Sequence, residues 1–124
     1  MIIIRDPTLT GTINDPTIRN LASTRFTQIL SGESYDYNQH GYMIIVEEGD
    51  SIADLEAETC CTISVDPMFE ALEEHDNCYE MLFILNDDGF AITLFIPKRG
   101  IDTELLKLCS EYAVPATVKS FISE

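Results

Sequence analysis

Hydrophobic residues recur along the chain with two spacings, and the spacing separates predicted helices from predicted strands. After Asp15-Pro16, apolar residues form a stripe with a helical period of about 3.6 residues, and polar residues fill the other side. Asp is a favoured N-cap and Pro fits the first helical position, so a helix is predicted near 16–31. Shorter stripes predict three further helices, near 51–59, 67–75 and 103–113.

Two hydrophobic runs joined by Asn86-Asp87-Asp88-Gly89 predict a β-hairpin over residues 79–96. Asp88-Gly89 is a signal for a two-residue type I′ turn, because both central residues of that turn need a positive φ. Both faces of the hairpin are mostly apolar, so we expect it to be central in the sheet. The predicted turn fixes three cross-strand pairs, Leu85 with Ile92, Phe83 with Leu94 and Met81 with Ile96.

The remaining segments complete a prediction of one α+β domain over residues 1–124. Residues 42–46 read as a strand, and the polar and aromatic residues 31–41 read as an exposed loop. Residues 61–65 and 116–122 are weaker strand candidates. The predicted architecture is a small, mainly antiparallel sheet, with the 79–96 hairpin at its centre and the four helices packed on it.

The composition fits an ordinary globular domain. The 124 residues are 45% hydrophobic, enough for a core without covalent staples. No run approaches the roughly 18 apolar residues that cross a bilayer, and the N-terminal residues 1–7 have the wrong order of charge and apolar residues for a signal peptide. We therefore expect a cytoplasmic protein. Its four cysteines are expected to be reduced: Cys60, Cys61, Cys78 and Cys109.

The charge of the chain is strongly one-sided and unevenly distributed. Seven Lys and Arg residues stand against 22 Asp and Glu residues, which gives a net charge of −15. From Phe26 through Pro97 there is no Lys or Arg at all. Such a surface repels phosphate backbones and anionic membranes, so neither nucleic acid nor membrane is an expected partner.

Acidic residues on the predicted helices 51–59 and 67–75 are candidates for binding a basic protein partner, because opposite single-sign surfaces associate fast and salt-sensitively. Like-charge pairs such as Asp54/Glu58 and Glu70/Glu74 cost helix stability. Tyrosines of the 35–42 loop add contact area at low entropic cost. The candidate partner-binding residues are Asp54, Glu56, Glu58, Glu70, Glu73, Glu74, Tyr35 and Tyr37.

These features favour a non-enzymatic binding protein of the inhibitor, immunity or DNA-mimic type, by analogy of charge and size. The alternative is a small homo-oligomeric cytoplasmic domain whose acidic residues only keep a rather hydrophobic protein soluble. The two hypotheses differ in one structural respect. A binding protein needs its carboxylates in one patch, whereas solvating acids scatter over all sides.

The turn Gly49-Asp50-Ser51-Ile52 lies between a predicted strand and a predicted helix, and it resembles the nucleophile block of the GDSL esterases with isoleucine in place of leucine. The resemblance implies a hydrolase that uses Ser51, which is the remote alternative for function. That family also needs an Asp-x-x-His block near its C-terminus, whereas the two histidines here are His40 and His75. We therefore expect Asp50 and Ser51 to cap the helix.

No metal or cofactor is predicted. Cys60, Cys61, His75 and Cys78 are zinc-binding residue types, but they lack the paired spacing that brings two ligands of one turn to the same ion. The acidic turns 47–50 and 86–89 offer oxygen atoms for calcium without the ligand spacing of an EF-hand.

Overall fold

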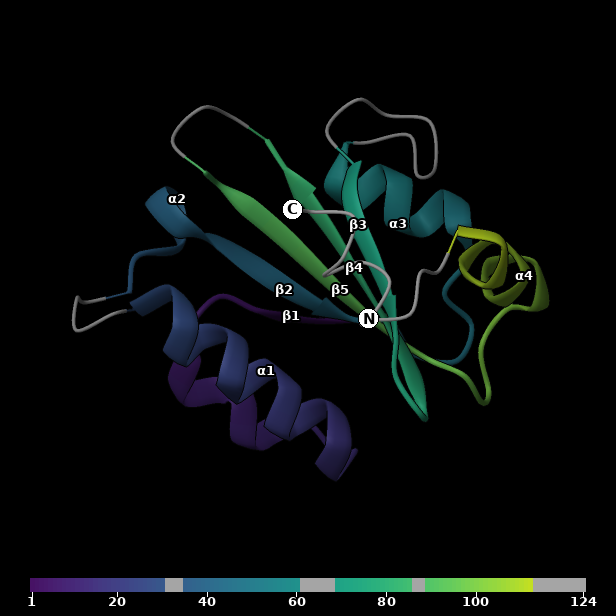
Figure 1. Cartoon of the computed structure of the whole chain (residues 1–124), viewed down its shortest axis with the longest axis horizontal. Coiled ribbons are helices and arrows are strands. Elements are labelled where there is room, and N and C mark those ends of the chain that lie inside the picture. The colour runs from purple at the N-terminus through teal and green to yellow at the C-terminus, as the bar shows by residue number, and fades with distance from the viewer. Residues whose placement is uncertain (31–34, 61–68, 86–88, 113–124) are drawn as a thin grey trace, which may run out of the picture.

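The computed structural model describes residues 1–30, 35–60, 69–85 and 89–112, which form a five-stranded mixed sheet with helices on both faces (Figure 1). The predicted α+β class, with a mainly antiparallel sheet, is confirmed. The sheet order is β1-β2-β5-β4-β3, and the β2/β5 pair is parallel while the other three pairs are antiparallel. The strands are β1 Ile2–Ile4, β2 Gly41–Ile45, β3 Phe69–Glu74, β4 Cys78–Ile84 and β5 Ala91–Pro97.

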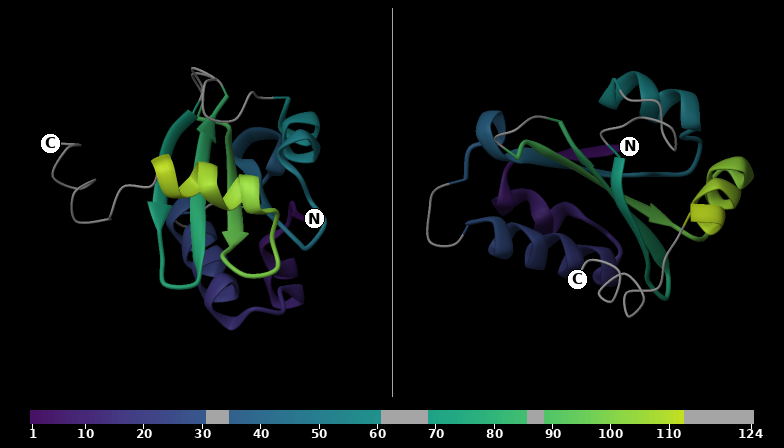
Figure 2. Two further views of the ribbon diagram at one scale, coloured as in Figure 1. Left: turned by 90° about the vertical axis from the view of Figure 1, so that its right-hand side faces the viewer. Right: turned by 45° about the horizontal axis from the view of Figure 1, so that its top comes forward.

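Three of the four predicted helices are confirmed, and they cover different faces of the sheet. α1 Pro16–Leu30 lies on one face with the 3₁₀ helix η1 Pro7–Thr12, while α3 Ile52–Thr59 and α4 Thr103–Tyr112 lie on the other (Figure 2). α1 begins where the Asp-Pro signal predicts, because Asp15 Oδ1 accepts hydrogen bonds from the backbone N–H groups of Thr17 and Ile18.

The central position of the hairpin is confirmed, and it follows from burial on both faces. Phe83 and Leu94 of β4 and β5 belong to a core with Leu55 of α3 and Leu105 of α4. On the opposite face, Phe95 belongs to a second core with Ile18 and Phe26 of α1. A sheet covered on both faces explains why its strands read as nearly continuous hydrophobic runs.

The predicted register of the hairpin is wrong by two residues. Met81 pairs with Leu94 and Phe83 with Ile92, and the N–H of Leu85 donates to the carbonyl of Phe90. The connection is therefore longer than the two-residue turn predicted at Asp88-Gly89, and residues 86–88 of it lie outside the described residues. Because the side-chain period of a strand is two, a shift by two leaves every side chain on its predicted face.

The predicted helix near 67–75 is wrong, because residues Phe69–Glu74 form the strand β3. β3 pairs antiparallel with β4, with a register irregularity between Phe69 and Ala71. This pairing supplies hydrogen-bond partners for the backbone of β4 on the side away from β5. The contact between distant segments therefore outweighs the helical spacing of the apolar residues. The correction matters for the acidic residues, since Glu73 and Glu74 now point to opposite faces of the sheet.

Short elements near the N-terminus were not anticipated. β1 pairs with β2, and a short helix, α2 Tyr37–His40, occupies part of the predicted 31–41 loop. The strand candidates at 61–65 and 116–122 lie outside the described residues. Within the described ranges, no helix combines the length and the apolar character needed to cross a membrane.

Candidate functional site

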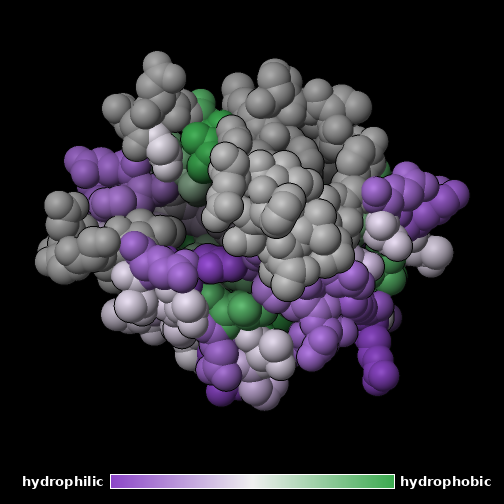
Figure 3. Space-filling model, in the orientation of Figure 1, coloured by the Kyte–Doolittle hydropathy of each residue, from purple (hydrophilic) through white to green (hydrophobic). Residues whose placement is uncertain are grey.

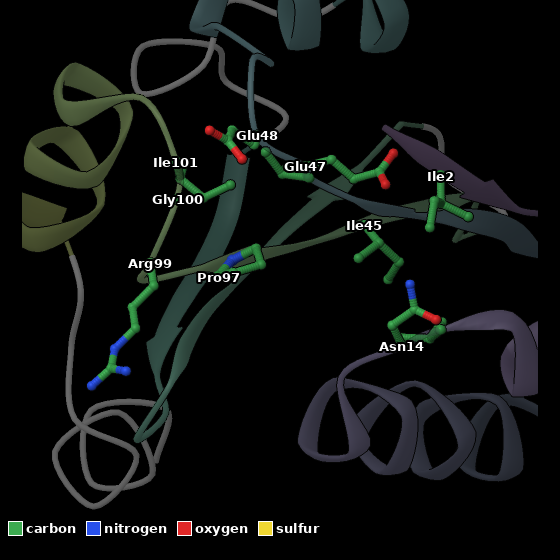
Figure 4. Close-up of a pocket in the computed structure, with 11 residues that line it drawn as sticks. Ile2, Asn14, Ile45, Glu47, Glu48, Pro97, Arg99, Gly100 and Ile101 are labelled. Carbon is green, nitrogen blue, oxygen red and sulfur yellow. The ribbon is translucent and has the colours of Figure 1, made fainter.

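An open cavity of about 260 Å³ lies where the parallel strands β2 and β5 end (Figure 4). The carboxyl ends of parallel neighbours meet at one edge of a sheet, and each chain then leaves through a separate connection, β2 toward α3 and β5 toward α4. The walls of this β2–β5 cavity are formed by Ile2, Ile13, Asn14, Ile45, Val46, Glu47, Glu48, Pro97, Arg99, Gly100 and Ile101.

The rim of the β2–β5 cavity is acidic. Glu47 and Glu48 diverge, Glu47 toward Ile2 and Glu48 toward Ile101, while the guanidinium of Arg99 points away from both (Figure 4). Glu48 is exposed, and so is Arg99. Glu47 and Glu48 therefore contribute two carboxylates to the lining of the cavity, on different sides of it, while the Arg99 guanidinium is turned away from both (Figure 4).

A cationic nitrogen is already bound beside this rim. The Met1 ammonium lies 3.1 Å from Glu47 Oε1 and 2.9 Å from Asp50 Oδ2. The hydrogen bond to Asp50 raises the pKa of this ammonium, with a further contribution from Glu47. Asp50 also accepts a hydrogen bond from the backbone N–H of Glu47 at 2.8 Å, which fixes the turn between β2 and α3.

The carboxylates of the rim continue into α3, and we call residues 47–58 the acidic segment. It contains Glu47, Glu48, Asp50, Asp54, Glu56 and Glu58. It contains no Lys or Arg. Among the described residues, the Met1 ammonium pairs with Glu47 and Asp50, and the guanidinium of Arg5 lies 3.9 Å from Glu58 Oε1. The segment therefore carries a surplus of negative charge along one continuous stretch of chain.

Ser51 of the acidic segment is the N-cap of α3, as predicted. Asp50, which was also expected to cap this helix, instead accepts from the N–H of Glu47 in the preceding turn. Ser51 Oγ accepts from the N–H of Asp54, and Asp54 Oδ2 accepts from the N–H of Ser51, so the two residues form a capping box. The hydrogen bond from the Ser51 backbone N–H lowers the pKa of Asp54. The Ser51 hydroxyl itself donates to Asp54 Oδ2 at 3.0 Å. His40 and His75 instead contact Asp36 and Glu80, so neither histidine pairs with Ser51 as the resemblance to an esterase would require.

A second cluster of titratable groups, Arg25, Glu73, His75 and Glu80, lies between α1 and the β3/β4 strands. Glu80 is only 8% exposed, and Arg25 donates to both of its oxygens, from Nη2 to Oε1 at 2.8 Å and from Nε to Oε2. His75 Nε2 lies 3.0 Å from Glu80 Oε1, and Arg25 Nη2 lies 3.3 Å from Glu73 Oε2. This Glu80 cluster is an ion-pair network under α1, in which one guanidinium lies between two carboxylates.

Arg25 explains how two carboxylates tolerate direct pairing in the sheet. Glu73 of β3 faces Glu80 of β4 in the antiparallel register, and such like-charge pairs are destabilising. Burial raises the pKa of Glu80, but the hydrogen bonds from Arg25 and His75 outweigh burial and lower it overall. Ligand atoms of Glu73, His75 and Glu80 lie within 4.8 Å of one another, a set that suits zinc, but the Arg25 guanidinium already occupies Glu80.

The lowered pKa of Glu80 predicts a specific loss of stability in acid. A carboxylate whose folded-state pKa is depressed stabilises the fold above its ordinary pKa of 4.5, and this contribution is lost as the pH falls through the folded value. We expect the urea midpoint of the wild type to fall more steeply below pH 4.5 than that of Glu80→Gln, and Glu104→Gln to follow the wild type. Equal slopes for all three proteins would contradict the ion-pair account.

The zinc-binding residue types are separated by the fold. Cys60 is exposed at the C-terminal end of α3, on one face of the sheet, while Cys78 is buried in the core beneath α1 on the other. Burial raises the pKa of Cys78 to about 12 and that of Cys109 to about 12. Cys61 lies outside the described residues.

The structure brings together some of the predicted partner-binding residues and separates others. Asp54, Glu56 and Glu58 share α3, whereas Glu74 is paired with Lys98 at 2.8 Å on the edge strand β3 and Glu73 lies in the Glu80 cluster. The side chain of Glu70 lies outside the described residues.

The two predicted tyrosines also differ. Tyr35 packs edge-on against Phe26 at 4.9 Å and stacks on His40 at 5.3 Å, and burial raises its pKa to about 12. Tyr37 remains 42% exposed, with Arg5 5.6 Å from its ring. Tyr35 therefore packs against the second core, whereas the side chain of Tyr37 is exposed to solvent.

Sequence reasoning missed the residues whose roles depend on long-range contacts. Glu47, Glu48 and Asp50 could have been marked from their consecutive acidic pattern after a predicted strand. Arg25 and Glu80 are 55 positions apart, and no local pattern connects them. Comparison with known protein families, curated proteins and solved structures finds no match to this chain, so the geometry alone carries the functional argument.

Proposed function

We propose that this protein is a non-enzymatic binding protein that engages a basic protein surface through the acidic segment, residues 47–58. The observation that carries the proposal is that residues 47–58 contain six carboxylates and no Lys or Arg. Its acids follow one turn and the helix directly after it, so they are consecutive along the chain. The biological class would be that of inhibitors, immunity proteins or DNA mimics, acting in the cytoplasm.

The physical role of such a segment is to speed association and to select partners by charge. Complementary potentials raise association rates well above those of neutral surfaces, and like-charged competitors such as nucleic acids are repelled. Three acids elsewhere in the described chain do have a cation beside them, Glu73 and Glu80 with Arg25 and Glu74 with Lys98. The acidic segment differs from these sites in having no Lys or Arg within its own sequence.

The competing account treats the acids as solvating groups of a homo-oligomer. Exposed acids do occur elsewhere, at Asp76, Glu104 and Glu111, and Figure 3 shows hydrophilic residues in several separate areas of one face. An experiment on the proposed function must therefore separate the position of the charges from their total number.

The first experiment is capture of partners from the source cell's lysate at about 50 mM and about 500 mM salt, a span over which exposed charges become largely screened. The proposal predicts a defined basic protein that is bound at low salt and released at high salt. Recovery of the protein alone, equally at both salt concentrations, would overturn the proposal in favour of self-association with solvating acids.

A further inference from the structure

We propose that the β2–β5 cavity receives a single arginine side chain of the basic partner, with its guanidinium at Glu48 and its aliphatic stem on the isoleucine wall. This inference rests on the proposed function, because it names the group of the partner that the acidic segment would guide into place. It adds a short-range contact to a long-range attraction, and the two can be tested separately.

The size of the cavity favours one side chain over a cofactor or substrate. Pockets that enclose drug-sized ligands measure about 300–1,000 Å³ and bury most of the ligand. The β2–β5 cavity holds about 260 Å³ and is open on one side. A long side chain entering from a partner would fill such a space, while its backbone stayed outside on the partner's surface.

The chemistry of the walls suits a group that is apolar along its length and cationic at its tip. Ile2, Ile45 and Ile101 line the cavity together with Pro97, and the carboxylates of Glu47 and Glu48 stand at its mouth (Figure 4). Arginine and lysine bury their methylene stems on apolar surface while the charged head reaches polar groups. A fully apolar occupant would leave the carboxylates unused, and an anionic one would be repelled by them.

One carboxylate of this rim, Glu47, already pairs with a cation of this chain, together with Asp50 of the adjoining turn. The Met1 ammonium is held by Glu47 and Asp50, and Glu48 is left exposed at the other side of the mouth. Arginine fits better than lysine for two reasons. Its guanidinium is more weakly hydrated, and its planar fork can bind a carboxylate through two parallel hydrogen bonds.

The test is a two-dimensional NMR titration of the ¹⁵N-labelled protein with N-acetyl-L-argininamide, with N-acetyl-L-norleucinamide as the uncharged probe. We expect saturable shifts at the amides of Ile45 to Glu48, Gly100 and Ile101 with the arginine probe and none with the norleucine probe. Glu48→Gln should weaken binding of the arginine probe about three- to fivefold, the upper part of the range for one exposed ion pair. The matched change Glu104→Gln on α4 should leave the affinity unchanged.

The outcomes separate this inference from the proposed function. Arginine-probe shifts outside the cavity, or equal affinity for the wild type and Glu48→Gln, would overturn the inference even if a basic protein is captured at low salt. If the arginine probe binds saturably and depends on Glu48, but the lysate experiment captures no basic protein, the cavity remains an arginine site. That result would overturn the proposed partner class instead.

Discussion

Replacing Arg25 with methionine is expected to lower the free energy of unfolding by about 2–3 kcal/mol, because it leaves the buried carboxylate of Glu80 without its bidentate partner. Breaking a fully buried ion pair costs about 3–5 kcal/mol. Arg25 is 30% exposed, so water can partly replace it, and the expected loss lies below that range. Methionine keeps the aliphatic stem of the side chain, so the change removes mainly the charge and its hydrogen bonds.

Two further variants make this prediction specific. Lys107→Met removes an exposed cation from α4 and should change the unfolding free energy by less than about 0.5 kcal/mol. Arg25→Met combined with Glu80→Gln should be more stable than Arg25→Met alone, because the uncompensated charge is gone. Chemical denaturation of the four proteins at pH 7 measures all of these differences. If Arg25→Met is no worse than Lys107→Met, then Arg25 does not neutralise Glu80.

Replacing Gly41 with alanine is expected to cost at least about 3 kcal/mol, since strain and steric overlap act together at this position. Gly41 begins β2 with φ +119°, which side chains rarely adopt, and a Cβ there would lie 1.7 Å from the backbone oxygen of Ala91. Gly41 and Ala91 are paired in the parallel β2/β5 ladder. An added methyl group must therefore separate the two central strands or change their register.

Gly11→Ala is the matched control for this substitution. Its added Cβ would meet no heavy atom within 4 Å, so we expect a change near zero in the thermal unfolding midpoint. Gly41→Ala should unfold at a clearly lower temperature than both the wild type and Gly11→Ala. A Gly41→Ala variant with wild-type stability would mean that β2 and β5 are not paired in the register described, and the β2–β5 cavity at their ends would lose its basis.

Elements with a strong local signal could be predicted from the sequence. α1 has an Asp-Pro start and a regular apolar stripe, and the β4/β5 hairpin has two apolar faces that require cover on both sides. The register of that hairpin could not be fixed to the residue, because the choice of turn among several adjacent polar residues shifts every pair at once. The prediction of which side chains share a face remained correct only because the register shift was two residues.

The segment 69–74 shows the limit of periodicity in short stretches. Leu72 and its acidic neighbours fit a helical face over one or two turns, but β4 presents an edge that pairs with the same residues as a strand. Whether this segment forms a helix or a strand therefore depends on its pairing with β4, which the segment itself does not encode. The same holds for the function of the acids. The sequence shows that Glu73 and Glu80 are acidic, and only the fold shows that both contact Arg25.

The acidic character of the candidate site could be predicted from the sequence, but its position in the fold could be predicted only in part. The excess of carboxylates and the absence of cations over residues 26–97 pointed to an acidic surface, and the residues of α3 belong to it. The cavity at the ends of β2 and β5 could not be predicted, because the parallel pairing of these strands was not indicated by any local pattern. Arg99 and Ile101 join Glu47 and Glu48 there only through that pairing.

The most direct test of the central claim is the affinity of the low-salt partner for two variants with the same net charge. Glu48→Gln/Glu58→Gln removes two carboxylates from the acidic segment, and Glu104→Gln/Glu111→Gln removes two from α4. We expect the first pair to weaken binding by about tenfold, from two exposed ion pairs, and the second pair to leave it nearly unchanged. Equal losses in both variants would mean that only total charge matters, and the acidic segment would then not be the binding surface.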